Sequence, residues 1–189
     1  MAIDEKAAQD AVYNLLSAME IDFSKHSDID KTPARVVKML SELWEGERYT
    51  NEDIAAMFGK TFESDVHDIV IVSNIPYFSY CEHHLALIYD LKISIGYLPN
   101  GKIIGLSKIA RIADMVCRRL QLQEKICNDI LDVIKKIIGD DVIVYAEGKH
   151  SCLTARGIKK FDSVTKTLAT SGVFYQKDFQ QNFFNLIRC

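Results

Sequence analysis

The sequence predicts an α+β fold in which helices cover one face of an antiparallel sheet and a helical extension precedes the sheet. Two helical patterns come before the first strand pattern, and strand patterns then lie on both sides of a pair of helical patterns. The chain has 189 residues and is 48% apolar, which is enough to bury a sizeable core. We divide it into an N-terminal helical region, residues 1–60, and a main α+β domain, residues 61–189.

The N-terminal region is predicted to form two helices. Apolar side chains recur at helical spacing from residue 4 to about residue 20, and a polar stretch follows at residues 24–31. Thr32 is then predicted to cap a second helix, with Pro33 at its first position and Gly46 at its end.

The main domain is predicted to begin with two strands. Residues 69–72 are a short apolar run, and residues 91–98 alternate between apolar and polar side chains with period two. The pair Asn100-Gly101 then signals a tight turn.

Two helices are expected next, and they form the helical pair between the strands. Ser107 is predicted to cap the first, whose apolar face continues to Leu120. The second is expected over residues 121–138 and stops at Gly139, because glycine commonly ends a helix.

The last part of the chain is predicted to return to extended structure. Residues 142–145 have a strand pattern, and residues 150–156 and 170–175 are also expected to be extended. Asp178 is predicted to cap a short terminal helix.

The composition argues against several classes of partner. A net charge of −3 provides no overall attraction to nucleic acids or anionic membranes. No apolar stretch approaches the roughly 18 residues that a membrane span needs, and the first residues lack the pattern of a secretory signal. We therefore expect a soluble, cytoplasmic protein that binds neither nucleic acid nor membranes.

Two clusters of cysteine and histidine could bind a metal. Cys81 and His84 are three positions apart, so that one helical turn would point both side chains the same way. Cys152 follows His150 by two positions, and in an extended segment these two side chains would share one face.

Cys81, His84 and Cys152 together offer zinc two thiolates and one imidazole, and leave a fourth position open for water, as in hydrolytic zinc sites. Burial of the two thiols without a metal is the alternative, and spacing alone leaves both interpretations open.

A second candidate group is cationic and suits an anionic ligand. Guanidinium groups and helix N-termini bind phosphate well, and a solvated basic surface is the alternative interpretation. The candidate residues near predicted element starts are Arg35, Ser107, Lys108, Arg111 and Arg156. Gln123 and Glu124 form a third group, because an amide beside a carboxylate can read the donor edge of guanine; on a helix such a pair is more often plain surface.

The order of these motifs resembles GTP cyclohydrolase I. The resemblance covers about four-fifths of the chain, from residue 32 onward. The motifs that carry it are Thr32-Pro33-x-Arg35, Cys81-Glu82-His83-His84, Gly105-Leu106-Ser107-Lys108 with Arg111, Gln121-x-Gln123-Glu124, His150-x-Cys152-x-x-x-Arg156-Gly157 and Ser163-x-Thr165-x-Thr167.

The resemblance implies the tunnelling fold for residues 61–189, which would be the catalytic domain. Members of this family assemble into toroidal homo-oligomers, typically decamers, with active sites at subunit interfaces. They hydrolyse GTP to 7,8-dihydroneopterin triphosphate and formate, the first step of folate or pterin biosynthesis.

The resemblance also implies roles for individual residues. Zn²⁺ would be bound by Cys81, His84 and Cys152, while His150 would protonate the purine during attack at C8. His83 would assist proton transfer during ring opening, and Ser107 would serve the later rearrangement of the ribose carbons. Gln123 and Glu124 would hold the guanine, and the triphosphate would contact Arg35, Lys108, Arg111 and Arg156.

Two alternative functions compete with this interpretation. A deazapurine nitrile reductase of the same fold would need a nucleophilic cysteine and NADPH, and would lack the Cys-Glu-His-His pattern. A non-catalytic, zinc-containing nucleotide-binding oligomer would be expected to lose His150 or Ser107 while keeping the metal ligands, and both residues are present.

Overall fold

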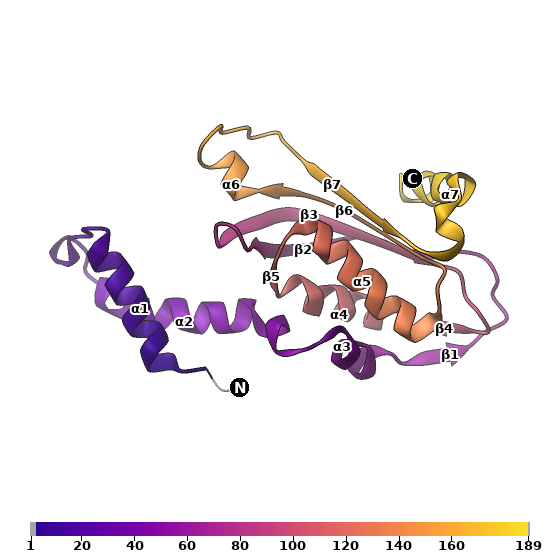
Figure 1. Ribbon diagram of the computed structural model, residues 1–189, viewed down its shortest axis with the longest axis horizontal. Coiled ribbons are helices and arrows are strands. Elements are labelled where there is room, and N and C mark those ends of the chain that lie inside the picture. The colour runs from indigo at the N-terminus through magenta and orange to yellow at the C-terminus, as the bar shows by residue number, and fades with distance from the viewer. Residues whose placement is uncertain (1–2, 189) are drawn as a thin grey trace.

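The computed structural model describes residues 3–188 and confirms the α+β class (Figure 1). The α-helices are α1 (Glu5–Ala18), α2 (Thr32–Leu43), α3 (Asn51–Phe58), α4 (Leu106–Cys117), α5 (Gln123–Ile138), α6 (Ser151–Thr154) and α7 (Lys177–Ile187). The strands are β1 (Thr61–Glu63), β2 (Val70–Cys81), β3 (Ala86–Tyr97), β4 (Lys102–Ile104), β5 (Leu120–Gln121), β6 (Val142–His150) and β7 (Thr165–Thr170).

The main sheet has five strands in the order β5-β2-β3-β6-β7. The four longer strands pair antiparallel, as predicted, but the short β5 pairs parallel to the end of β2, so the sheet is mixed. Strands β1 and β4 form a separate two-stranded sheet that the sequence analysis did not predict.

Helices contact both faces of the main sheet, and the prediction of one covered face is therefore wrong. On β6, Val142 and Val144 belong to the main core with α4 and α5, whereas Ile143 packs with Phe174 and Phe183 on the other side. Figure 1 shows α7 across the sheet from α4 and α5. The cause lies in the sequence of β6, where consecutive apolar side chains point alternately to the two faces and both must be covered.

The two N-terminal helices are confirmed, with one difference at the start of α2. Thr32 is the first residue of this helix and not its cap, which is Lys31 without a side-chain hydrogen bond. The sequence analysis missed α3, although Thr50 and Asp53 form a capping box at its start. This helix has only eight residues, which is too short for a clear period.

The first two strands of the sheet are longer than predicted, at 12 residues each. Register shifts between Val72 and Ile75, and between Tyr77 and Ser79, interrupt the alternation that sequence analysis relies on. Gly101 has a φ of +70° at the bend between β3 and β4, which agrees with the predicted turn.

The starts of the central helices differ slightly from prediction. Ser107 is the second residue of α4, and Gly105 occupies the cap position. Leu120 lies in β5 and not on this helix. Helix α5 begins at Gln123 and ends at Gly139, whose φ of +115° confirms the predicted stop.

Two of the predicted extended segments are wrong. After β6 ends at His150, residues 151–154 form helix α6. Strand β7 ends at Thr170, and Gly172–Tyr175 is a 3₁₀-helix. Asp178 lies in the first turn of α7, whose cap is Gln176.

Arg119 joins the segment after α2 to the main domain through one buried network. Its guanidinium donates to the Gly46 carbonyl at 3.3 Å, to the Tyr49 carbonyl and Asn51 Oδ1 at 2.8 Å each, and to Asp129 Oδ2 at 2.8 Å. This network lies directly before β5, so it also supports the strand that pairs with the end of β2. Across residues 3–188, no helix has the length and apolar character that crossing a bilayer requires.

Candidate active site

Cys81 and His84 meet because the β2–β3 hairpin turns tightly between them. Cys81 is the last residue of β2, and the backbone N–H of His84 donates to the Cys81 carbonyl at 3.4 Å. Leu85 completes the turn with a φ of +50°, before β3 begins at Ala86. The two side chains therefore converge through a hairpin turn, and not through the helical turn that their spacing suggested.

Cys152 reaches the same place from the other side of β3. Strand β6 pairs with β3 up to His150, opposite Ile88, and α6 begins at the next residue. Ser151 Oγ donates to the Leu87 carbonyl at 2.8 Å, and the Tyr89 hydroxyl donates to Thr154 Oγ1 at 3.0 Å. These bonds hold α6 against the first residues of β3. His150 and Cys152 thus do not share a strand face, as had been predicted.

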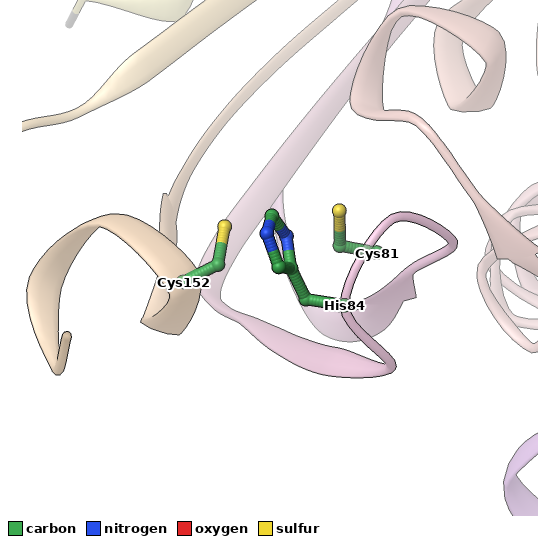
Figure 2. Close-up of side chains that lie close together, drawn as sticks. All are labelled: Cys81, His84 and Cys152. Atoms are coloured by element: carbon green, nitrogen blue, oxygen red, sulfur yellow. The ribbon is translucent and has the colours of Figure 1, made fainter. Parts of the chain in front are cut away.

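The three predicted metal ligands come together within this arrangement (Figure 2). The ligand atoms of Cys81, His84 and Cys152 all lie within 4.8 Å of one another. Cys81 is buried, Cys152 is half-buried and His84 is exposed, so the group opens toward solvent on one side. Burial and then the neighbouring Cys81 thiol raise the pKa of Cys152.

This donor set fits a metal ion. Two closely spaced thiols would repel each other as thiolates, and a cation between them would remove that cost. Thiolate and imidazole ligands favour zinc and similar ions, and three protein ligands leave one position of a tetrahedral site free. The arrangement could therefore hold a metal and still admit a small molecule.

His150, Gln123 and Glu124 form a second group beside the cysteines. Gln123 is only 1% exposed, and its Oε1 lies 2.8 Å from Nε2 of His150. Burial lowers the pKa of His150, and the nearby Glu124 carboxylate opposes that effect. Glu124 itself is exposed at the start of α5.

The cationic residues lie at three places in the fold. Arg156 follows α6 and lies close enough to Cys152 for its charge to act on the thiol, against the effects of burial and of Cys81. Arg35 lies in the first turn of α2 and pairs with Asp28 at 3.5 Å, where both side chains are exposed. Lys108 and Arg111 lie near the start of α4, together with the exposed Ser107.

Within residues 3–188, no side-chain hydrogen bond or ion pair joins Ser107, Lys108 or Arg111 to the cysteine cluster. Helix α4 starts after β4 and ends at Cys117, shortly before β5, which pairs with Cys81. Ser107 and Cys117 are about 15 Å apart along the helix axis. A single chain therefore brings together the predicted metal ligands, His150, Glu124 and Arg156, but leaves Ser107, Lys108 and Arg111 in the first half of α4.

His83 and the other cysteines that the structure describes lie outside the cluster of candidate ligands. His83 is exposed in the hairpin turn, with its ring centroid 6.3 Å from that of His84. Cys117 and Cys127 are core residues, 2% and 1% exposed. Cys189 lies outside the described residues.

The sequence analysis did not single out two residues that hold this site together. Tyr89 and Ser151 fix α6 on β3, and no local pattern marked either of them. Thr165 and Thr167, which accept hydrogen bonds from Gln123, were noted only as part of a motif. Thr165 and Thr167 are two positions apart, and residues with that spacing on a strand lie on the same face of the sheet. That spacing was the signal that could have identified them.

Comparison with known proteins gives one consistent result. The family model described as GTP cyclohydrolase I matches residues 8–188. The protein named GTP cyclohydrolase 1 from Clostridium botulinum (strain Loch Maree / Type A3) is 51% identical over 178 residues, covering 90% of this chain and 89% of that protein. The proteins of the same name from Clostridium acetobutylicum and Ruminiclostridium cellulolyticum are 46% and 48% identical, and each alignment covers more than nine-tenths of both chains.

Proposed function

The chain belongs to the GTP cyclohydrolase I family and is an enzyme of that family, and on this premise we propose that it hydrolyses GTP to 7,8-dihydroneopterin triphosphate and formate with a bound zinc ion. The observation that carries the proposal is that the ligand atoms of Cys81, His84 and Cys152 lie within 4.8 Å of one another. His150 ends strand β6, two residues before Cys152.

The metal would be held by Cys81, His84 and Cys152. When bound, zinc supplies the Lewis acidity that activates water at neutral pH. The buried Cys81 anchors the group, while the exposed His84 leaves an approach from solvent. The chain thus offers an open site of the kind that suits hydrolysis and not a closed structural one.

His150 would act as the general acid. Attack at C8 makes that carbon tetrahedral, and the adjacent purine nitrogen must then gain a proton. An imidazole suits this role because it changes protonation near neutral pH. His150 is half-buried and lies two residues before Cys152 in the chain, which supports a role as a proton donor close to the metal ligands. His83, on the same turn as His84, would assist the proton transfers of ring opening.

Glu124 and Gln123 would recognise the guanine. The exposed Glu124 carboxylate can accept from the ring N–H and the amino group of guanine, and it lies near His150. Gln123 is buried and its amide N–H groups are used within the protein, so only its Oε1 has acceptor capacity left for a base.

The triphosphate would be bound by Arg156 together with Lys108, Arg111 and Arg35, and Ser107 would serve the rearrangement of the ribose. Because Ser107, Lys108 and Arg111 do not join the cysteine cluster within one chain, a neighbouring subunit would supply them. We therefore propose a toroidal homo-oligomer, of the decameric type, with active sites between subunits. The cytoplasm is its proposed location.

The two alternatives receive no support from the comparisons. The similar proteins carry the name GTP cyclohydrolase 1, and none of those cited is named as a nitrile reductase or a non-catalytic binding protein.

The test couples metal analysis to GTP turnover on one purified sample. We expect about one zinc per chain and one formate released for each GTP consumed. Zinc-loaded protein that binds GTP but releases no formate would support the non-catalytic alternative. Turnover that is unchanged after complete removal of the metal would contradict the role of Cys81, His84 and Cys152.

A further inference from the structure

The side-chain amide of Gln123 can take only one orientation. Its Nε2 lies 3.0 Å from the Thr165 carbonyl, 3.4 Å from the Ala146 carbonyl and 3.3 Å from Thr167 Oγ1. Backbone carbonyls accept hydrogen bonds and never donate them. A flipped amide would place Oε1 against both carbonyl oxygens in a buried site, where unpaired acceptors are costly. The amide nitrogen therefore faces β6 and β7.

The opposite end of the same amide then determines where His150 carries a proton. Oε1 of Gln123 lies 2.8 Å from Nε2 of His150, and an amide oxygen can only accept. The ring nitrogen facing it must therefore be Nε2–H. Gln123 is 1% exposed, so bulk water does not compete for this bond.

We propose that Gln123 is a positioning residue that accepts a hydrogen bond from Nε2–H of His150 and so fixes the imidazole ring, which leaves Nδ1 as the nitrogen that meets the substrate. In the part of the chain that the structure describes, Nδ1 of His150 has no hydrogen-bond partner of its own. The statement about Nε2 rests on geometry alone, and the statement about the substrate rests on the proposed function.

This arrangement makes proton delivery possible without any movement of the ring. The imidazolium form carries a proton on each nitrogen. Nδ1–H passes its proton to the purine nitrogen, whose lone pair forms the new N–H bond, and the electron pair of the broken bond stays on Nδ1. Nε2–H remains bonded to Gln123 throughout. Gln123 thus acts through His150.

The first test is an NMR measurement on the metal-loaded protein, labelled with ¹⁵N in histidine, at one fixed pH and without GTP. We expect an exchange-protected ring proton on Nε2 of His150, assigned by its absence in His150→Ala. Gln123→Met should lose this protection, because methionine keeps the shape but offers no comparable acceptor. A wild-type spectrum with the proton on Nδ1 and a bare Nε2 would overturn the proposal, even if Gln123→Met failed to fold.

Gln121→Met is the matched control. Gln121 is also 1% exposed and its amide is also bonded within the protein, to the Val116 carbonyl, but it does not contact His150. The Gln121→Met variant should keep the protected His150 proton. If the protected His150 proton were lost in both Gln123→Met and Gln121→Met, removal of either buried amide would disturb the ring. That result would also contradict the proposal.

The second test is a double-mutant cycle on GTP turnover. Gln123→Met should lower kcat by about 10- to 100-fold, the usual effect of removing a supporting partner, and should change little further in a His150→Ala background. An equal loss of kcat in both backgrounds would show that Gln123 does not act through His150 and would overturn the proposal, whereas its proposed contact with guanine is measured separately as a change in KM. If the wild type released no formate at all, the proposed function would fail, while the NMR result would still decide the position of the proton.

Discussion

The sulfur atoms of Cys81 and Cys152 lie within 4.8 Å of each other, one at the end of β2 and the other in the first turn of α6. Strand β3 lies between these two elements, and α6 is bonded to it through Ser151 and Thr154. The sheet and these hydrogen bonds therefore hold the two cysteines in place relative to each other. Such a pair can bind an ion without a large rearrangement.

Cys152→Ala should remove the metal. Only one thiol and one imidazole would remain, and two ligands do not retain zinc against a chelator. We expect the zinc content, measured by mass spectrometry of the purified protein, to fall from about one per chain to almost none, with activity lost in parallel. Cys117→Ala is the control. This buried thiol is outside the cluster, so the variant protein should keep its zinc. Full occupancy in Cys152→Ala would remove that residue from the ligand set.

His150→Ala should keep both zinc and GTP binding but lose turnover. A positioned proton donor contributes roughly 10²- to 10⁴-fold to rate, and kcat should fall by that amount. Zinc content and turnover are measured on the same sample, with His67→Ala, an exposed histidine before β2, as the comparison. If the zinc is lost as well, His150 belongs among the ligands. Near-normal turnover would exclude it from the chemistry.

Arg156→Ala should mainly weaken GTP binding. Charge-assisted contacts to phosphate serve the bound substrate and the transition state alike, so KM should rise while kcat changes little. Steady-state kinetics give both values, and Lys160→Ala, an exposed cation four residues later, is the control. A reduced kcat at unchanged KM would contradict phosphate binding by Arg156.

Asp129→Ala should destabilise the fold more than an exposed aspartate does. Arg119 and Asp129 form a pair at 2.8 Å with side chains 9% and 13% exposed. Removing one partner leaves a buried charge, which costs about 3–5 kcal/mol. Urea denaturation measures this loss. Asp10→Ala, whose side chain is 55% exposed and pairs with Lys6, should cost less than about 1 kcal/mol. If both aspartate variants lost the same free energy of unfolding, burial of the Arg119–Asp129 pair would not contribute to stability.

Local sequence patterns were sufficient to predict the fold class, the longer helices and the candidate metal ligands. Helices α1, α2 and α5 span several turns, so that their apolar period and their end signals can be read locally. The residue types of Cys81, His84 and Cys152 favour zinc or a similar ion over a hard cation, because ligand chemistry belongs to the side chain and not to the fold.

How these residues meet depends on contacts between distant segments of the folded chain. Helix α6 has four residues, and the bulges of β2 break its alternation, so neither could be read from a period. The pairing of β3 with β6 brings Cys152 to the hairpin, and the pairing of β6 with β7 provides the carbonyls that orient Gln123. Each of these contacts joins segments far apart in the chain, and a local pattern carries no information about them, because burial and hydrogen bonding depend on what lies across the sheet.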